Sequence, residues 1–261
     1  MPKSIFANTR YFIVDMDGTF YLDGTIIPGA DRFLRRVKDC GKDFFFFTNN
    51  SSNNVQSCRA RLAQMGFPVE EQTVIISSHV AIAYIQKHHP GAAVYLLGNE
   101  NLMVDAEAAG IRLVQEKPEV VLLGFDTTLT YEKIRKAAQF ITDGAVYLAT
   151  HPDKTCPAVG GFIPDTGSMM EMFSAATGRY PTVLGKPTVH TVDYLTARLG
   201  CFRTDLAFVG DRLETDIAIA AKYGIPCALV LTGVTTAESY EQSDIRADVV
   251  VPSLADLAEY L

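Results

Sequence analysis

The sequence predicts an α/β protein with a mainly parallel sheet, and two observations support this fold class. Short apolar runs such as Tyr11–Val14 and Val120–Leu123 recur along the chain, bounded by glycine, proline or polar residues. Such runs are typical of strands that are buried on both faces, as in parallel sheets. Segments with apolar residues at helical spacing separate these runs. Alternation of strands and helices through all 261 residues favours the α/β class over all-α and all-β folds.

The first third of the chain supplies three predicted strands, a hairpin and two predicted helices. The strands cover residues 11–14, 44–47 and 73–76, and the hairpin turns at Asp23-Gly24. This hairpin, at residues 20–27, is expected to hang over the end of the first strand. One helix carries a stripe of Ala30, Phe33, Leu34, Val37 and Cys40 and ends at Gly41, and the other carries Val55, Cys58, Leu62 and Met65 and ends at Gly66.

The middle of the chain, from about residue 79 to 180, is predicted to form a self-contained block of the same kind. Its strands are expected at residues 94–97, 120–123 and 146–149, with a helix at 131–141. Residues 151–168, rich in Pro, Gly and Asp, are expected to form a loop.

The last third returns to the pattern of the first. It supplies strands at residues 206–209, 228–231 and 248–251 and a helix at 215–223 that is capped by Gly224. Another helix is expected after Gly185-Lys186, with Pro187 in its first turn. Proline suits this position because the N–H groups of the first turn have no partner within the helix, so its missing N–H costs no hydrogen bond.

The composition bears on the cellular compartment and on the class of binding partner that we expect. Hydrophobic residues make up 48% of the chain, enough for a sizeable core in one large or two modest domains. The net charge of -7 argues against nucleic acid or an anionic membrane as the main partner, but a small anionic substrate is compatible with a site that holds a cation. No apolar stretch is long enough to span a bilayer, and no signal peptide is visible. The five scattered cysteines predict reduced, mostly buried thiols, and we expect a cytoplasmic protein.

Two carboxylates follow the first strand directly. Asp15 and Asp17 come where a buried strand ends, and this edge of an open α/β sheet is where ligands bind. A Ca²⁺ loop of the EF-hand type is excluded, because its sixth position would be Phe20 instead of Gly and its twelfth Ile26 instead of Glu. A pair of acidic residues at a strand end is by itself more often solvated than catalytic.

Four more polar residues occupy comparable positions later in the chain. Thr48 ends the second strand, Lys186 precedes a helix, and Asp211 and Asp216 follow the strand at 206–209. Each alone has an ordinary structural interpretation: Thr48 as a helix cap, Lys186 as a surface lysine, and Asp216 as an acid that complements a helix dipole.

Their joint occurrence favours phosphoryl chemistry. If the strands are neighbours, all these groups meet at one edge, where Asp15, Asp17 and Asp211 could not stay ionised together without a cation. Oxygen ligands suit Mg²⁺, while a hydroxyl from Thr48 and a point charge from Lys186 suit a phosphoryl group. Asp15 could then act as the nucleophile and form an aspartyl-phosphate.

In combination these residues resemble the four motifs of the haloacid dehalogenase superfamily. The motifs are Asp15-Met-Asp17-Gly18-Thr19, Thr48-Asn49, Lys186 and Gly210-Asp211-Arg-Leu-Glu-Thr-Asp216, and the longer runs FTNNSS, ATHPD, GKPT and GDRLETDI resemble the NagD / 4-nitrophenylphosphatase branch. The resemblance implies a Rossmann-like parallel-sheet core, residues 1–80 and 181–261, with an inserted α/β cap of the C2 type at 81–180. It also implies an Mg²⁺-dependent phosphatase that hydrolyses a small phosphomonoester, such as a sugar phosphate, a nucleotide or phosphoglycolate, through an aspartyl-phosphate.

The same resemblance implies a role for each motif residue. Asp15 attacks phosphorus and binds Mg²⁺, and Asp17 acts as the acid and base while its carbonyl contacts the metal. Thr48 and Asn49 bind the phosphate, and Lys186 neutralises charge on the nucleophile and the phosphoryl group. Asp211 ligates the metal, and Asp216 orients Lys186 or a metal-bound water.

Two departures from this branch lie in the expected cap and bear on the substrate, not on the chemistry. The branch usually has Asn where His151 stands, and PGxGS where this chain has Pro164-Asp165-Thr166-Gly167-Ser168. We expect His151 and Asp153 to contact the part of the substrate that differs between esters. A small phosphorylated metabolite is the expected partner, and a homo-oligomer formed through the cap is left open.

Other functions are weighed against this one. A phosphomutase or another phosphoryl transferase would use the same aspartate, whereas a dehalogenase does not need an acid at Asp17. A non-enzymatic phospho-acceptor of the receiver type also combines Asp, Thr, Lys and Mg²⁺. Such a protein is one small domain whose nucleophile follows a middle strand, whereas this chain is longer and its candidate nucleophile follows the first strand. A catalytically silent binding protein would not need the complete set of groups.

Overall fold

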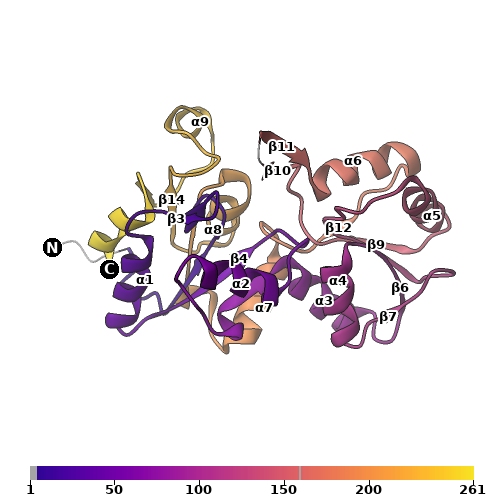
Figure 1. Cartoon of the computed structure of the whole chain (residues 1–261), viewed down its shortest axis with the longest axis horizontal. Helices are drawn as coiled ribbons and strands as arrows, with labels where there is room; N and C mark the ends of the chain where they lie inside the picture. Colours follow the sequence, from indigo (N-terminus) through magenta and orange to yellow (C-terminus); the bar gives the residue numbers. More distant parts are fainter. Residues whose placement is uncertain (1–4, 159) are drawn as a thin grey trace. The chain divides into compact units, whose positions relative to one another are not determined.

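The computed structural model describes residues 5–158 and 160–261, which form two compact units (Figure 1). The first unit contains the described residues up to Thr48 together with Val55–Ile75 and Leu195–Leu261. The second contains Asn49–Asn54 and Ile76–Tyr194. The short segment Asn49–Asn54 therefore belongs to the second unit although both its flanks belong to the first.

A six-stranded sheet in the order β15-β14-β13-β1-β4-β5 forms the centre of the first unit. Its strands are β1 (Tyr11–Val14), β4 (Asp43–Thr48), β5 (Val74–Ile76), β13 (Leu206–Gly210), β14 (Cys227–Val230) and β15 (Val249–Val251). The central strand β1 pairs in parallel with β13 and with β4, so that Val14 lies opposite Val209 and Phe46. Phe12, Ile13 and Val14 are buried, as expected for a strand that is covered on both faces.

Helices and a short hairpin complete the first unit. These elements are the hairpin β2 (Tyr21–Leu22) and β3 (Thr25–Ile26), and the helices α1 (Ala30–Asp39), α2 (Val55–Gln64), α8 (Ala218–Tyr223) and α9 (Ala237–Gln242), with a π-helical segment at Leu213–Ile217 and 3₁₀ turns at Glu71–Thr73, Arg203–Asp205 and Leu254–Tyr260. The sequence of α1 shows why such a helix forms. Phe33, Leu34 and Val37 recur at helical spacing and are buried, whereas the residues between them are charged.

The second unit has its own parallel sheet, in the order β12-β9-β8-β6-β7. Its strands are β6 (Ala93–Leu97), β7 (Arg112–Leu113), β8 (Val120–Leu123), β9 (Val146–Ala149) and β12 (Thr182–Val183), and its helices are α3 (Ser77–His88), α4 (Glu100–Ala108), α5 (Tyr131–Thr142) and α6 (Thr166–Thr177). Figure 1 shows α5 and α6 on one face of this sheet and α3 and α4 on the other. Helix α7 (Val189–Leu199) begins in the second unit and ends in the first.

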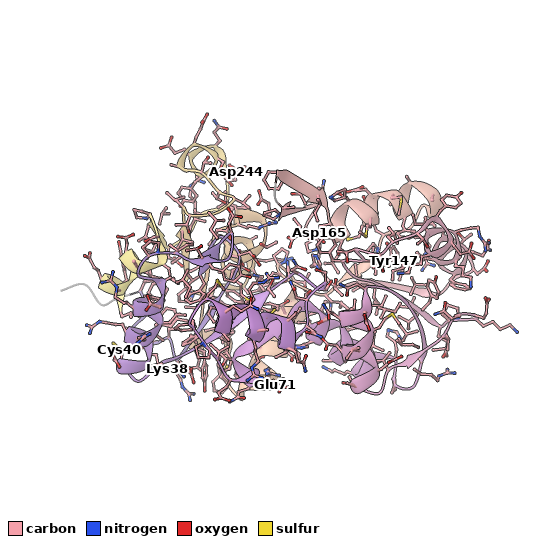
Figure 2. All side chains as sticks on the ribbon, in the orientation of Figure 1. Lys38, Cys40, Glu71, Tyr147, Asp165 and Asp244 are labelled. Atoms are coloured by element: carbon pink, nitrogen blue, oxygen red, sulfur yellow. The ribbon has the colours of Figure 1, made fainter. Side chains whose placement is uncertain are left out.

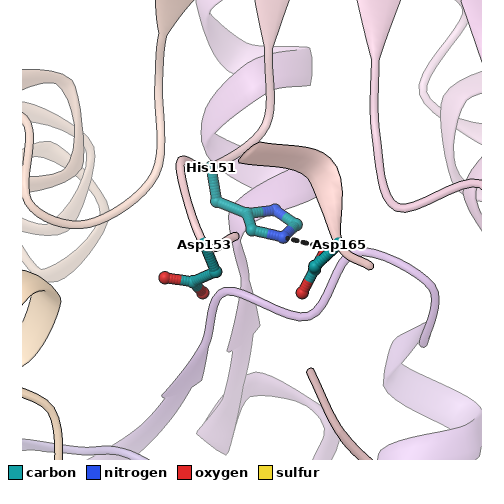
Figure 3. Close-up of side chains that lie close together, drawn as sticks. All are labelled: His151, Asp153 and Asp165. Atoms are coloured by element: carbon teal, nitrogen blue, oxygen red, sulfur yellow. Dashed lines mark hydrogen bonds and ion pairs between the residues drawn. The ribbon is translucent and has the colours of Figure 1, made fainter. Parts of the chain in front are cut away.

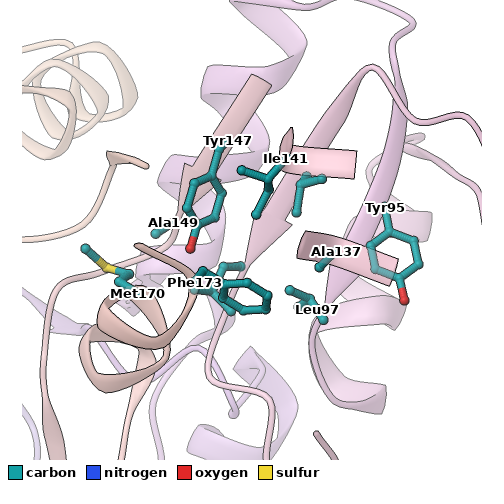
Figure 4. Packing of buried hydrophobic residues seen from close by; sticks show 10 residues of the cluster. Tyr95, Leu97, Ala137, Ile141, Tyr147, Ala149, Met170 and Phe173 are labelled. Carbon is teal, nitrogen blue, oxygen red and sulfur yellow. The ribbon is translucent and has the colours of Figure 1, made fainter. Parts of the chain in front are cut away.

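Alternate residues of the strands build one core layer of the second unit (Figure 4). The layer comprises Tyr95, Leu97, Val121, Leu123, Tyr147 and Ala149 from the sheet, Ala137 and Ile141 from α5, and Met170 and Phe173 from α6. The strand residues are spaced by two because successive side chains of a strand point to opposite faces. Both helices are therefore held to the sheet by one continuous apolar layer.

The structure confirms the predicted α/β class, and most predicted strands occur within one residue of their expected bounds. The strands predicted at 11–14, 120–123 and 146–149 coincide with β1, β8 and β9. The predicted hairpin at 20–27 is also present as β2 and β3, which pair Tyr21 with Ile26.

Three local predictions are wrong. Residues 151–168 are not one loop: they contain an antiparallel hairpin, β10 (Thr155–Ala158) and β11 (Gly161–Pro164), and the start of α6. Pro187 does not lie in the first turn of a helix, because α7 begins only at Val189. Cys40 does not extend the buried stripe of α1, because the helix ends at Asp39 and Cys40 is exposed (Figure 2).

The cysteines are free, as predicted, but only Cys58 and Cys227 are buried. Burial raises the pKa of Cys227 to about 12, so this thiol remains protonated at neutral pH. Among the described residues, no helix combines the length and the apolar character that a membrane crossing requires.

Candidate active site

Asp15 and Asp211 lie at the carboxyl ends of two neighbouring parallel strands. Strand β1 ends at Val14 and β13 at Gly210, so that each acid is the first residue beyond its strand. The Asp15 N–H donates to the Val209 carbonyl at 2.9 Å, which extends the pairing past the end of β1. Parallel pairing thus brings together two carboxylates from opposite ends of the chain.

Asp216 completes a group of three carboxylates. One oxygen from each of Asp15, Asp211 and Asp216 lies within 4.8 Å of the other two. Asp216 comes from the π-helical segment Leu213–Ile217, a rare element that is often found at functional sites. Asp211 and Asp216 are buried and Asp15 is partly buried. Three ionised carboxylates at this spacing repel one another, and their oxygen donors fit a hard divalent cation such as Mg²⁺.

Neighbouring groups donate hydrogen bonds to the Asp211 carboxylate, and a glycine leaves the space that it occupies. Val234 N–H donates to Asp211 Oδ2 at 2.6 Å, and Thr19 Oγ1 donates to Oδ1 at 3.3 Å. A Cβ atom on Gly233 would lie 1.9 Å from Oδ2, so only glycine permits this close approach. The carboxylate is therefore held in a fixed orientation by groups from two separate loops.

Asp17 lies in a different environment, held by Tyr21 and Arg61. Tyr21 Oη donates to Asp17 Oδ2 at 3.0 Å, and Arg61 donates to Tyr21 Oη at 3.1 Å while lying 3.9 Å from Asp17 Oδ1. Burial and the charge of Asp17 raise the pKa of Tyr21, so that its hydroxyl keeps its proton and remains a donor.

Loss of solvation raises the pKa of Asp17 above its usual value, and Arg61 and the Tyr21 hydroxyl oppose this rise. The side chain still has 46% of its surface exposed, which limits the rise and leaves the carboxyl accessible to a reacting group. Asp17 is therefore better suited to exchange protons than the buried Asp211.

Thr48 and Asn49 end the strand next to β1. Thr48 is the last residue of β4 and is buried, two positions beyond the Val14–Phe46 pair. Asn49 follows it in the chain and belongs to the second unit.

Within the second unit, Asn49 binds the backbone of Lys186 through both ends of its side-chain amide. Lys186 N–H donates to Asn49 Oδ1 at 3.0 Å, and Asn49 Nδ2 donates to the Lys186 carbonyl at 3.1 Å. A Cβ atom on Gly185 would lie 2.8 Å from Asn49 Oδ1 and 2.4 Å from the Thr150 carbonyl, so glycine is needed before Lys186. The motif Gly185-Lys186 and the motif Thr48-Asn49 are thus joined by a specific pair of hydrogen bonds.

His151, Asp153 and Asp165 form a second polar cluster, also in the second unit (Figure 3). His151 Nε2 donates to Asp165 Oδ1 at 2.9 Å, and the Thr166 N–H donates to the same oxygen, so Asp165 also caps helix α6. Burial raises the pKa of Asp165, but the charge of His151 and these hydrogen bonds outweigh it, and the net pKa lies below the usual value. His151 is completely buried, whereas Asp153 is partly exposed.

The structure thus brings the predicted residues together in three groups: Asp15 with Asp211 and Asp216, Asn49 with Lys186, and His151 with Asp153 and Asp165. Tyr21 and Arg61 did not emerge from the sequence as site residues. The hairpin prediction placed Tyr21 near the end of β1, but no sequence pattern connects Arg61 of α2 to Asp17.

The chain is similar to known proteins over nearly its full length. Residues 12–112 match a family model described as haloacid dehalogenase-like hydrolase, and residues 183–257 match one described as HAD-hydrolase-like. A dihydroxyacetone phosphatase from Corynebacterium glutamicum (strain R) is 31% identical over 248 residues, which cover 95% of this chain and 90% of that protein.

Solved structures agree with this similarity. A 4-nitrophenylphosphatase from Thermotoga maritima is 41% identical and superposes with a TM-score of 0.94 over 98% of both chains. A glycerol phosphate phosphatase from Mycobacterium tuberculosis, in complex with magnesium, is 30% identical, with a TM-score of 0.89 over 98% of this chain and 79% of that one.

Proposed function

Because the chain belongs to the haloacid dehalogenase-like hydrolases and is a hydrolase of phosphate monoesters, we propose that it uses Mg²⁺ to hydrolyse a small phosphorylated metabolite through an aspartyl-phosphate on Asp15. The observation that carries this proposal is the group of three carboxylates at the ends of β1 and β13. Repulsion among three close carboxylates destabilises the folded chain unless a cation binds between them.

The donor set fits Mg²⁺, which prefers carboxylate and carbonyl oxygens and leaves positions for water and substrate. Asp15 and Asp211 would hold it through their carboxylates and Asp17 through its backbone carbonyl, with Asp216 close enough to orient a ligand. When bound, the ion offsets negative charge on the carboxylates and on the phosphoryl group.

The chain's own groups supply the two chemical steps. In the first, Asp15 forms a bond to phosphorus as the bond to the ester oxygen breaks, and Asp17 gives its proton to the departing alcohol. In the second, water attacks the phosphorus of the aspartyl-phosphate as the bond from phosphorus to the Asp15 oxygen breaks, Asp17 takes a proton of that water, and inorganic phosphate leaves with the Asp15 carboxylate restored. The accessible carboxyl of Asp17, with a raised pKa, suits both duties.

Thr48, Asn49 and Lys186 are proposed to bind the transferred phosphoryl group. The Thr48 hydroxyl and the Asn49 N–H would donate to its oxygens, and the Lys186 ammonium would offset the charge that spreads over them. The hydrogen bonds between Asn49 and the Lys186 backbone support a joint role, because they tie two of the three groups to each other.

The substrate is proposed to be a small sugar or polyol phosphate. The relatives named for dihydroxyacetone and for glycerol phosphate act, by their names, on three-carbon compounds. Asp153, which is partly exposed, is the better placed of the two predicted cap residues to contact the alcohol part. His151 is buried, so that its effect on the substrate would be indirect.

The test is turnover of p-nitrophenyl phosphate with Mg²⁺, in excess EDTA, and after Asp15→Asn. We expect turnover only with Mg²⁺ and a loss of at least about 10⁴-fold in the variant, because the substitution removes the nucleophile. Asp23→Asn is a matched control, since Asp23 is exposed in the tip of the β2–β3 hairpin. Metal-independent turnover, or single-turnover phosphorylation of the Asp15→Asn variant, would contradict the proposal.

A further inference from the structure

The segment Asn49–Asn54 contacts the carboxyl end of four strands of the second unit. Asn49 bonds to Lys186, which follows β12, and Ser51 Oγ lies 2.9 Å from Oγ1 of Thr150, which follows β9. Ser51 Oγ also accepts the Phe125 N–H, beyond β8, at 2.8 Å. The carbonyl of Ser52 accepts from Asn99, beyond β6, at 2.8 Å, and from Asn101 at 2.9 Å. The segment that continues Thr48 is therefore fastened along one edge of the second sheet.

A buried hydroxyl also anchors the backbone of Asn49 itself. Ser77, the first residue of α3, donates from Oγ to the Asn49 carbonyl at 2.7 Å. Asn49 is thus held by Ser77 at its backbone, while its side chain holds Lys186. Ser77 is completely buried, so water cannot replace this bond without a local rearrangement.

His151 connects these anchors. Its Nδ1 lies 2.9 Å from Thr150 Oγ1 and 3.4 Å from Ser77 Oγ, while Nε2 bonds to Asp165. An ionised Asp165 can only accept, so Nε2 carries a proton whether or not the ring is charged, and whenever the ring is neutral Nδ1 accepts from Thr150. The hydrogen bonds can then run in one direction, from Ser51 through Thr150 and His151 to Asp165.

The arrangement Asp165–His151–Ser77 has the residue types of a nucleophilic triad, but it cannot act as one. Ser77 is completely buried and gives its hydrogen to the Asn49 carbonyl. A nucleophile must meet a substrate, and a base must receive its proton. The same contacts instead suit a rigid support for the backbone of Asn49.

We propose that Ser77, His151, Thr150 and Ser51 are positioning residues that fix Asn49 and Lys186 for phosphoryl transfer. The proposal rests on the proposed function in its assignment of Asn49 and Lys186. Small displacements of charge-stabilising groups lower the rate strongly, because these groups act only when they are aligned with the transition state. His151 thereby acts through other residues and not by contact with the substrate.

Ser77→Ala and Ser78→Ala form a matched pair of variants. Both serines lie in the first turn of α3 with 0% exposure, but Ser78 Oγ has no hydrogen-bond partner among the described residues. Ser77→Ala should speed hydrogen exchange at the Lys186 amide at least about tenfold, because the bond to Asn49 Oδ1 protects that amide. It should also lower kcat for p-nitrophenyl phosphate about 10- to 100-fold with KM within about threefold. Ser78→Ala should match the parent in both measurements.

Conservative variants separate positioning from a general loss of structure. Ser77→Thr keeps the hydroxyl and should restore most of kcat, and Thr150→Ser should be milder than Thr150→Val for the same reason. Unchanged exchange at Lys186 in Ser77→Ala would overturn the proposal whatever the activity. Faster exchange with an unchanged kcat would overturn the positioning role. If the proposed function is wrong, the parent chain itself will show no Mg²⁺-dependent turnover. Hydrogen exchange at the Lys186 amide in the parent and in Ser77→Ala would still decide whether Ser77 fixes Lys186.

Discussion

Asp17 differs from the other acids of the site in its partners and in its exposure. Tyr21 and Arg61 hold its carboxyl, which remains partly exposed, whereas Asp211 and Asp216 are buried. A proton donor acts most strongly on a poor leaving group, because such an alcohol cannot depart as an anion. The chemistry of the leaving group therefore tests the role of Asp17.

Asp17→Asn is expected to lower kcat/KM by about 10² to 10⁴ for an alkyl phosphate such as glycerol phosphate. The loss should be smaller for p-nitrophenyl phosphate, since nitrophenolate leaves without a proton. Steady-state kinetics on both esters, with Mg²⁺ held constant, measure the difference. Equal losses on the two esters would indicate that Asp17 acts mainly on the metal.

Asp105 of α4 gives a prediction about stability and pH. Its Oδ2 is buried and finds no hydrogen-bond partner in the part of the chain that the structure describes, and burial raises the pKa of this carboxyl to about 6. The folded chain therefore binds more protons than the unfolded chain between about pH 4 and pH 6, so Asp105 costs stability at pH 7, and this cost shrinks as the pH falls from 6 and is gone below about pH 4.

Asp105→Asn should accordingly be more stable than the parent at pH 7 by about 1 kcal/mol, a value reduced for the partial exposure of the side chain. At about pH 4 the two proteins should have nearly equal stability. Urea unfolding at both pH values provides the measurement. A difference that does not depend on pH would mean that the charge of Asp105 is not its cause.

At the residue scale the sequence identified the acids but not their supports. Asp15, Asp211 and Asp216 are predictable because each follows a strand or lies in a recognisable motif. Arg61 and Ser77 are not, because each acts through a tertiary contact with a residue far away in the chain. An arginine on α2 or a serine that opens α3 carries no local pattern that indicates its partner.

At the scale of elements, strands with strongly apolar sequences were predictable and the β10–β11 hairpin was not. The hairpin contains two prolines and two glycines among residues 155–164, which favour a loop. Its side chains are mostly exposed, with Phe162 at 64%, so it lacks the alternation of buried and exposed residues that identifies a strand. Antiparallel backbone pairing joins the two strands.

Helix α6 depends on the core layer that it shares with the second sheet. Phe173 is 1% exposed and packs with its ring 6.2 Å from that of Tyr147. Phe173→Ala should destabilise the chain by about 3 to 5 kcal/mol, through lost burial and the cavity that remains. Phe162→Ala removes the same group from an exposed site and should change stability by less than about 0.5 kcal/mol. Thermal unfolding compares the two, and similar losses would show that α6 is not held by this layer.

At the scale of the whole molecule, alternation predicted two blocks of parallel sheet, and the structure contains two such sheets. The assignment of residues 1–80 and 181–261 to a core and 81–180 to a cap remains a prediction. Sequence could not show that Asn49–Asn54 belongs with the second sheet, because its six polar residues resemble an ordinary loop and their partners lie beyond four different strands.

Metal binding should couple the carboxylate group to the stability of the folded chain. Without a cation, Asp15, Asp211 and Asp216 repel one another, so Asp216→Asn should raise the melting temperature in EDTA. The amide keeps an acceptor for the Arg212 N–H, which now donates to Asp216 at 3.3 Å.

With Mg²⁺ the order of stability should reverse. We expect the ion to bind the folded parent and to stabilise it by about 2.7 kcal/mol when free Mg²⁺ is about 100 times its dissociation constant. Asp216→Asn has less negative charge to attract the ion and should gain less, ending below the parent. Asp244→Asn makes the same change of charge at an exposed position (Figure 2) and should follow the parent under both conditions. Thermal unfolding of the three proteins over a Mg²⁺ titration measures the reversal. If Mg²⁺ raises the melting temperature of the parent and of Asp216→Asn equally, the charge of Asp216 does not contribute to metal binding. Its role would then be confined to the orientation of neighbouring groups.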